Sequence, residues 1–463
     1  MRTKMMMMCV SLAAAAAMGE VVVTAPEAPF EMPEIRVWEA PGRDFAITDF
    51  GAVADGKTKN TEAFAKAIAA CSEAGGGRVV VPAGEWLTGG VRLKSNVELH
   101  LSEGAKVVFT DDPQDYMPAV ATSWEGVEVM NDQPLVYAYG CTNVAVTGKG
   151  TLAPQMHVWR TWFQRPPAHM AFTAALYEWC SKVAPLAERD ALAMPGSNAR
   201  PHLLQFNRCA NIHLADFAIR EAPFWTIHLY HSENAYLHGL DVFAHGHNND
   251  GVDVEMTKNV IVENCRFDQG DDAVVIKAGR NQDAWALDRP SENIVVRNCE
   301  IVDGHVLLGI GSELSGGVRN VYMHDCRMVG NALNVFYFKT NERRGGVIEN
   351  IYMKDCEVKA IGKKPPNSVV GFETDVMYQW RKLPTYDVKV TKFRNIVAEN
   401  VRVNCANHVL CIHGDEREPV DGVTLKNVTC DDVKKDRIVV MNARSVTVEG
   451  AEIPSKPGKA PSK

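Results

Sequence analysis

A short hydrophobic pattern recurs along most of the chain. An asparagine is followed by alternating apolar residues and then by Asn, Asp or Gly, as in NIHLADFAI from residue 211, NVIVENCRF from 259 and NIVVRNCEI from 293. Further copies begin at residues 234, 320, 350 and 395, and looser ones at 96, 143, 422 and 445. Several successive copies begin 23 to 30 residues apart, and self-similarity at such a period is typical of a solenoid.

Period-two alternation within each copy indicates β-strands, and no helical pattern separates them. Each unit is expected to contain two short strands that meet at a polar corner. Because each strand pairs with the equivalent strand of the next unit, the sequence predicts an all-β fold, a right-handed parallel β-helix. This β-solenoid is expected to form a single domain over residues 43–455.

A solenoid needs its open strand edges covered at the ends. After Asn60 and Thr61, the apolar residues Phe64, Ala67, Ile68 and Cys71 follow at helical spacing and a glycine run ends the pattern. This amphipathic segment predicts an N-terminal capping helix.

Residues 155–200 lack the repeat and have helical composition. They predict an insertion beside one coil. Its residues Trp159, Trp162 and Trp179 either form the insertion's own small core or stack on a bound sugar.

Four cysteines occupy the same position in consecutive units: Cys265, Cys299, Cys326 and Cys356. They are predicted to stack inside the coils as small hydrophobic residues, because the ligand spacing of a zinc motif is absent. The sequence does not decide whether two of Cys405, Cys411 and Cys430 form a disulfide.

The first residues are typical of a targeting segment. Arg2 and Lys4 flank the start of an apolar run rich in Met and Ala, and polar, proline-bearing sequence follows. Since the run is too short to cross a bilayer as a stable helix, we expect residues 1–22 to be a signal peptide and the protein to be secreted or periplasmic.

Composition narrows the classes of partner. With 463 residues, 46% of them hydrophobic and 23% charged, the chain is long enough to bury a large core. A formal net charge of −8 argues against a nucleic-acid partner, which needs a basic surface. No later segment is long and apolar enough for a membrane span. We also expect the protein to be a monomer.

Carboxylates interrupt two neighbouring units. Asp250 lies in HGHNNDGVDVE, and Asp271 and Asp272 lie in FDQGDDAVVIKAG, 21 residues further on. That separation is close to one repeat, and equivalent corners of stacked coils lie about 4.8 Å apart. The three carboxylates are therefore expected to converge on one face.

Any single aspartate here is more simply a turn residue. Two adjacent acids gain nothing as turns, however, and three carboxylates within several ångströms repel one another, which raises at least one pKa. A protonated acid beside ionised carboxylates is what hydrolysis of a glycosidic bond requires.

Basic residues recur roughly one coil apart after these acids. A single histidine such as His305 is more often structural. If it stacks above the acids, however, it can fix the orientation or the protonation state of a carboxylate. Lys339, followed by Arg343 and Arg344, is either solvated or able to bind an anionic sugar.

The ordered motifs resemble those of the polygalacturonase family of glycoside hydrolases, family 28, and the resemblance covers most of the chain. Where that family has Asn-Thr-Asp, Asp-Asp, Gly-His-Gly and Arg-Ile-Lys, this sequence has NND at 248–250, DD at 271–272, GHV at 304–306 and YFK at 337–339. The stretch APFWTIHLYH from residue 222 is similar to the family's mid-helix coil.

This resemblance implies inverting hydrolysis of α-linked galacturonic acid or related pectic glycans, with no metal or other cofactor. By the same resemblance, Asp271 is the general acid, Asp250 and Asp272 activate the attacking water, and His305 supports the acid. The resemblance and the sequence context together assign substrate binding to a further set: Asn248, Trp225, His228, Tyr337, Lys339, Arg343 and Arg344. If the Trp-bearing insertion closes one end of the cleft, the enzyme acts in exo fashion on oligosaccharides.

One departure from the family pattern bears on the substrate. Tyr337 stands where the family has an arginine that grips a galacturonate carboxylate with Lys339, and a phenol cannot replace a guanidinium. Either Arg343 or Arg344 takes over, or the sugar beyond the cleaved bond is not plain galacturonate. Val306 for glycine crowds the region beside His305.

Two other functions stay open on the sequence. A pectate-lyase-like enzyme would eliminate rather than hydrolyse, with calcium held by the carboxylates and a basic residue among them. A noncatalytic β-helix that binds surface glycans would keep the acids as corner residues.

Overall fold

The computed structural model describes residues 20–23, 26–362, 364–376 and 387–450. Most of the predicted signal peptide therefore lies outside the described residues, although Glu20–Val23 already form strand β1. Export and the monomeric state stay predictions. No helix in the described ranges is long and apolar enough to cross a bilayer.

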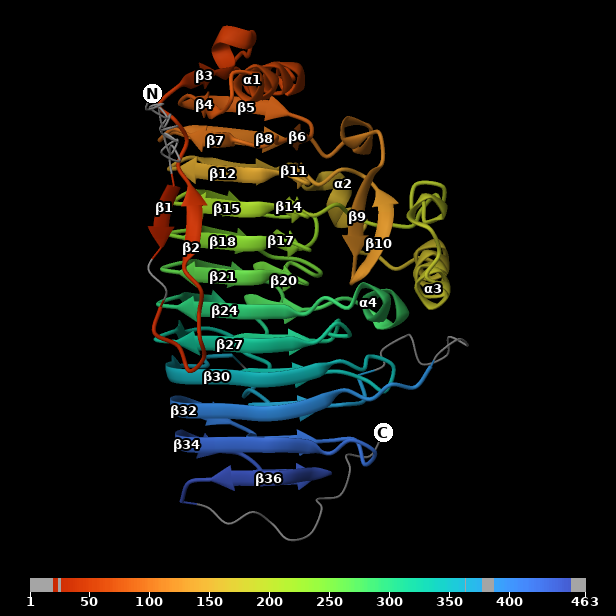
Figure 1. Ribbon diagram of the computed structural model, residues 1–463, viewed down its shortest axis with the longest axis vertical. Helices are drawn as coiled ribbons and strands as arrows, with labels where there is room; N and C mark the ends of the chain where they lie inside the picture. Colours follow the sequence, from red (N-terminus) through yellow and green to blue (C-terminus); the bar gives the residue numbers. More distant parts are fainter. Residues whose placement is uncertain (1–19, 24–25, 363, 377–386, 451–463) are drawn as a thin grey trace, which may run out of the picture.

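Parallel strands stack coil upon coil from one end of the molecule to the other (Figure 1). This is the predicted right-handed parallel β-helix. Each central coil contains three strands rather than the two that the sequence predicted. The strand that was missed is buried along its whole length in many coils, as in VDVE and VVIK, so it shows no polar alternation.

The first ladder of strands carries the recurrent asparagine. It consists of β3 (Asp44–Ala46), β4 (Gly77–Val81), β7 (Val97–Leu101), β12 (Thr142–Gly148), β15 (Ala210–Ala215), β18 (Glu233–His238), β21 (Lys258–Glu263), β24 (Ser291–Arg297), β27 (Val318–His324), β30 (Val347–Val358), β32 (Lys392–Ala406), β34 (Val420–Val433) and β36 (Ala443–Val448). The asparagines have positive φ and their side-chain amides hydrogen-bond from coil to coil, as from Asn293 Nδ2 to Asn259 Oδ1 at 3.1 Å.

The second ladder follows each corner. It consists of β5 (Gly84–Thr88), β8 (Ala105–Phe109), β13 (Thr151–Pro154), β16 (Ala218–Arg220), β19 (Asp241–Ala244), β22 (Arg266–Gln269), β25 (Glu300–Asp303) and β28 (Arg327–Met328), and continues in the second part of β30.

The third ladder is an eleven-stranded parallel sheet. It consists of β6 (Val91–Arg92), β11 (Val136–Tyr139), β14 (Leu204–Asn207), β17 (Ile227–Tyr230), β20 (Val252–Glu255), β23 (Val274–Lys277), β26 (Leu308–Gly311), β29 (Phe336–Lys339), β31 (Ser368–Glu373), β33 (His408–His413) and β35 (Ile438–Met441). The inward side chains of all three ladders form one continuous apolar core.

The N-terminal end is capped as predicted. Helix α1 (Thr61–Glu73) buries Phe64, Ala67, Ile68 and Cys71 against the first coils. The 3-10 helix η1 (Ile47–Phe50) lies beside it. Asn60 does not cap the helix with its side chain, which instead bonds the main chain of Val53 and Leu87.

The described cysteines are all free, and the four equivalent ones are buried in the core as predicted. The possible disulfide among Cys405, Cys411 and Cys430 is therefore not formed.

Additional elements stand on one side of the stack, beside the middle coils (Figure 1). They are the antiparallel pair β9 (Val120–Trp124) and β10 (Val127–Asn131), the 3-10 helices η2 (Pro113–Tyr116) and η3 (Leu186–Glu188), and the helices α2 (His157–Thr161), α3 (Pro167–Lys182) and α4 (Asn281–Leu287). Helices α2 and α3 form the predicted insertion, and α3 contacts α4 and β10. A separate pair, β1 with β2 (Ile35–Trp38), lies along the outside of the first ladder.

Candidate active site

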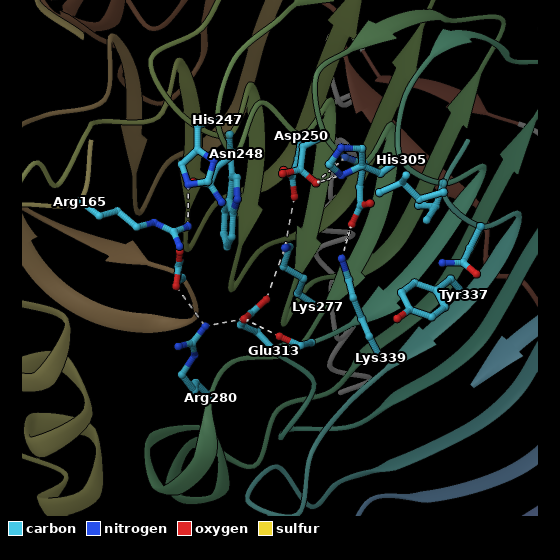
Figure 2. Close-up of a pocket in the computed structure, with 18 residues that line it drawn as sticks. Arg165, His247, Asn248, Asp250, Lys277, Arg280, His305, Glu313, Tyr337 and Lys339 are labelled. Carbon is cyan, nitrogen blue, oxygen red and sulfur yellow. Dashed lines mark hydrogen bonds and ion pairs between the residues drawn. The ribbon is translucent and has the colours of Figure 1, made fainter. Parts of the chain in front are cut away.

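The three predicted carboxylates meet in one pocket at the third ladder. Asp250 lies just before β20, and Asp271 and Asp272 lie just before β23, which pairs with β20 in parallel register. The Gly251 amide donates to the Asp272 carbonyl at 2.9 Å, which fixes the two turns side by side. All three acids line a pocket of about 420 Å³ (Figure 2).

Asp271 is the most accessible of the three acids, with 22% of its side chain exposed against 4% for Asp250 and 2% for Asp272. His305 Nδ1 lies 2.9 Å from Asp271 Oδ1. Burial alone would raise the pKa of Asp271, but the hydrogen bond and charge of His305 lower it to about 2. Burial likewise opposes the charge on His305, yet Asp271 raises the pKa of the imidazole.

Asp250 has the opposite protonation behaviour. It is buried, and burial is the main cause that raises its pKa to about 7, with the negative charges of Asp271 and Asp272 acting in the same direction. Lys277 Nζ, 3.3 Å from Asp250 Oδ2, opposes that rise. One of the three carboxyls therefore has a raised pKa as predicted, but burial contributes more to the rise than repulsion does, and in the free protein the raised carboxyl is Asp250 and not the expected acid, Asp271.

The third carboxylate is held by the predicted lysine. Lys339, the last residue of β29, places its Nζ 2.6 Å from Asp272 Oδ2. Two residues earlier on the same strand, the Tyr337 hydroxyl donates to Glu373 Oε2 on β31. His305, just before β26, and the β29 residues Tyr337 and Lys339 thus come from two successive coils and reach the same pocket.

Comparison with known proteins places this arrangement in a family. The model of glycosyl hydrolases family 28 matches residues 188–448, and that of rhamnogalacturonase A/epimerase, pectate lyase-like, matches residues 45–101. The chain belongs to glycosyl hydrolase family 28. It is therefore a glycoside hydrolase, and the acids that the motifs singled out lie within the matched region.

Relatives of this family 28 protein cover most of the chain. It is 33% identical to a hyperthermoactive exopolygalacturonase of Thermotoga maritima, with a TM-score of 0.81, over 90% of this chain and 94% of that one. A probable polygalacturonase of Vitis vinifera is 26% identical over 83% of this chain and 73% of its own length. An exo-poly-alpha-D-galacturonosidase of Dickeya chrysanthemi is 29% identical over 59% of this chain, which spans 48% of that relative.

Two of the other predicted binding residues line the pocket of this family 28 enzyme. Asn248 does so with positive φ, and its Oδ1 accepts a hydrogen bond from Arg200 at 3.0 Å. Trp225 presents its ring to Lys277, whose Nζ lies 4.2 Å from the ring centroid.

Three predicted binding residues are not at the pocket, and these assignments are corrected. His228 is fully buried in β17, where its Nε2 lies 2.8 Å from Glu255 Oε2. Arg344 is buried behind the pocket wall and donates to the Ser312 carbonyl at 2.7 Å, while the side chain of Arg343 is not among the lining residues. Both arginines follow the end of β29, after the chain has turned away from the pocket.

A largely buried charged network that lines the pocket was not predicted from the sequence. Lys277 lies 3.3 Å from Asp250, 3.4 Å from Asp253 and 3.4 Å from Glu313. Glu313 also binds Arg280. Burial opposes the charge on Lys277, but the three surrounding carboxylates raise its pKa well above its usual range. Lys277 was detectable in principle, because it ends the VVIK strand that follows Asp271 and Asp272.

The insertion forms the wall of the pocket that lies toward the N-terminal coils. Arg165 lines the pocket and donates to His247 Nε2 at 2.6 Å, and no carboxylate in the described ranges forms an ion pair with Arg165. Arg200 holds the wall in place by donating to the His247 carbonyl. No sequence signal identified Arg165, because it lies in the segment without repeats.

The tryptophans of the insertion do not reach the pocket. Trp159 is fully buried against the β-helix core, Trp162 packs on the same core, and Trp179 packs on a small core shared with β9 and β10. Trp159 and Trp179 are therefore packing residues, whereas Trp162 also lines a small hollow that shares Arg165, His247 and Asn248 with the pocket.

The donor atoms of Asp271, Asp272 and His305 lie within 4.8 Å of one another and form a possible metal-binding group. Calcium takes six to eight oxygen ligands, whereas this group offers a ring nitrogen, and Lys339 already neutralises Asp272. A lyase also needs a basic residue that gives up its proton, and the raised pKa of Lys277 keeps that amine charged. The donor set fits hydrolysis better than calcium-dependent elimination.

Proposed function

We propose that this protein hydrolyses the bond to the terminal galacturonate residue of pectic oligosaccharides, with inversion at the anomeric carbon. The observation that carries the proposal is the convergence of Asp250, Asp271 and Asp272 in one pocket whose wall bears Arg165. The named activity of the exopolygalacturonase of Thermotoga maritima supports the substrate and the exo action.

Asp271 is the proposed general acid because its carboxyl is the accessible one of the three and has His305 beside it. In the free protein the proton of this pair lies on His305, as the low pKa of Asp271 requires. A bound uronate brings a negative charge and excludes water, and both changes raise a carboxyl pKa. The substrate thus shifts the proton along the hydrogen bond toward Asp271, which then protonates the leaving oxygen.

Asp250 and Asp272 are the proposed holders of the attacking water. An inverting mechanism leaves room for that water by separating acid and base by about 6.5–9.5 Å. Donor atoms of Asp272 and Asp271 lie within 4.8 Å of one another, so Asp250 is the proposed base and Asp272 helps to hold the water. Lys277 and Lys339 keep the two carboxylates oriented through contacts of 3.3 and 2.6 Å. Because burial holds the pKa of Asp250 at about 7, the ionised base forms as the pH rises through that value.

Arg165 is the proposed ligand of the terminal galacturonate carboxylate. Its guanidinium is exposed in the pocket and has no carboxylate partner within the described residues. A guanidinium binds a carboxylate through paired, charge-assisted hydrogen bonds. Since the insertion that carries Arg165 walls this end, a chain enters with its terminal residue first, which supports removal of single units.

The test is product analysis with oligogalacturonates of defined length. We expect monogalacturonate as the first product, of inverted anomeric configuration by proton NMR at early times. Asp271→Asn should lower kcat by about 10²–10⁴-fold, the usual contribution of general acid catalysis, at unchanged melting temperature. Asp216→Asn, an exposed acid on the outer face, is the matched control.

Two outcomes would contradict the proposal. Products that absorb as unsaturated uronides would show a lyase. Full turnover by Asp271→Asn would remove Asp271 from the mechanism.

A further inference from the structure

The two ends of the pocket differ in whether a basic side chain there lacks a carboxylate partner (Figure 2). Arg165 and His247 lie at one end, and Arg165 forms no ion pair with a carboxylate of the described residues, whereas Arg280 nearby is paired with Glu313 and Glu125. Tyr337 lies at the opposite end, beyond His305 and Lys339. Leu333, which is 54% exposed, also lines the pocket, and its amide donates to the carbonyl of His305 at 2.7 Å.

The basic groups at the Tyr337 end already have partners. Lys339 Nζ lies 2.6 Å from Asp272 Oδ2, and His305 Nδ1 lies 2.9 Å from Asp271 Oδ1. The Tyr337 hydroxyl is directed to Glu373, which adds a further negative charge beside the pocket. Because Lys339 and His305 are paired with Asp272 and Asp271, an incoming carboxylate at this end would meet the charge of Glu373 with no lysine or arginine among the pocket-lining residues left to balance it there.

This end receives the sugar that leaves. If Asp271 is the general acid, the oxygen it protonates belongs to the leaving sugar, which then lies on the far side of Asp271 from Arg165. His305, Leu333 and Tyr337 come from the coils that follow Asp271 and form that side. This assignment of the leaving sugar to the Tyr337 end rests on the proposed function.

We propose that the leaving sugar is uncharged: the enzyme releases a terminal galacturonate from a neighbour that carries no carboxylate. A neutral sugar and a methyl-esterified galacturonate share this chemistry. Either one avoids repulsion from Glu373, and either can set an apolar edge against the exposed side chain of Leu333. The burial of Arg344 removes one guanidinium that could have compensated for Tyr337.

The experiment compares three disaccharides with the same terminal galacturonate: digalacturonate, its reducing-end methyl ester, and galacturonosyl-rhamnose. We expect kcat/KM for at least one uncharged leaving group to exceed that for digalacturonate by about tenfold or more, since like charges placed together oppose binding strongly. The two uncharged substrates distinguish an ester from a neutral sugar.

Two variants test the cause. Tyr337→Arg and, separately, Glu373→Gln should raise kcat/KM for digalacturonate relative to the uncharged substrates. Raising the salt concentration should narrow the difference in the wild type, because screening weakens repulsion between charges.

Equal or faster hydrolysis of digalacturonate by the wild type would overturn the inference and leave the proposed hydrolysis intact. Absence of turnover on all three disaccharides and on longer oligogalacturonates would instead contradict the proposed function, and the inference with it.

Discussion

Replacing Asn293 tests why an asparagine recurs in nearly every coil. Asn293 has a φ of 58° and lies within a ladder of side-chain amides. Its Nδ2 donates to Asn259 Oδ1 at 3.1 Å, and its Oδ1 accepts from Asn320 Nδ2 at 3.0 Å. Asn293→Ala removes both bonds and leaves a residue with a Cβ but no polar group in the left-handed region.

The expected loss of stability follows from these two effects. Each ladder bond contributes about 0.5–1.5 kcal/mol, and the left-handed conformation costs alanine about 1 kcal/mol. The free energy of unfolding should therefore fall by about 2–4 kcal/mol in Asn293→Ala. Asn293→Gly loses the same bonds but has no steric penalty at positive φ, so it should be the milder substitution by about 1 kcal/mol, the conformational cost assigned to alanine.

Urea denaturation followed by circular dichroism measures both variants. Asn331→Ala is the control, because Asn331 is exposed and donates to a single surface carboxylate, that of Asp303; its effect should stay below about 1 kcal/mol. If Asn293→Ala were no worse than Asn331→Ala, the ladder would not stabilise the coils. If it equalled Asn293→Gly, the backbone part of the reasoning would fail.

Three further predictions concern charge. Lys277→Met should move the acidic limb of kcat/KM from about pH 7 to higher pH, since the lysine lowers the pKa of Asp250; a limb that stays in place would contradict this. Arg165→Met should reduce kcat/KM on oligogalacturonates by about 10–150-fold, which corresponds to the loss of a charge-assisted hydrogen bond. The control Arg160→Met only breaks an exposed ion pair with Glu221 and should leave kcat/KM unchanged. Burial raises the pKa of Glu255 to about 8, so the folded state keeps a proton that the unfolded state loses above about 4.5. The free energy of unfolding therefore falls as the pH rises from about 4.5 to about 8. Glu255→Gln should flatten this fall in a pH series of denaturation midpoints.

Some expectations from the sequence failed for identifiable reasons. The third strand of each coil was missed because a strand such as VVIK is buried on both faces and lacks alternation. Arg343 and Arg344 were placed at the pocket by their closeness to Lys339 in the sequence, yet a side chain's direction after a strand ends depends on the turn. His228 was included with its neighbour Trp225, and the two rings do meet, with their centroids 5.1 Å apart. His228, however, is fully buried and bound to Glu255, and the sequence gives no sign of that burial.

The repeated pattern by itself determined the solenoid, the core position of the cysteines and the meeting of Asp250 with Asp271 and Asp272. It could do so because a coil of nearly constant length brings residues one repeat apart into register, whatever lies elsewhere in the chain.

Only the tertiary structure decided which carboxyl keeps its proton, which cations balance the acids, and that Arg165 of the insertion faces the pocket. Protonation depends on burial and on the distances to Lys277 and His305, which follow from how the side chains of neighbouring coils pack and not from the repeat pattern. The difference between the two ends of the pocket is likewise tertiary, since its residues come from the insertion and from several separate coils.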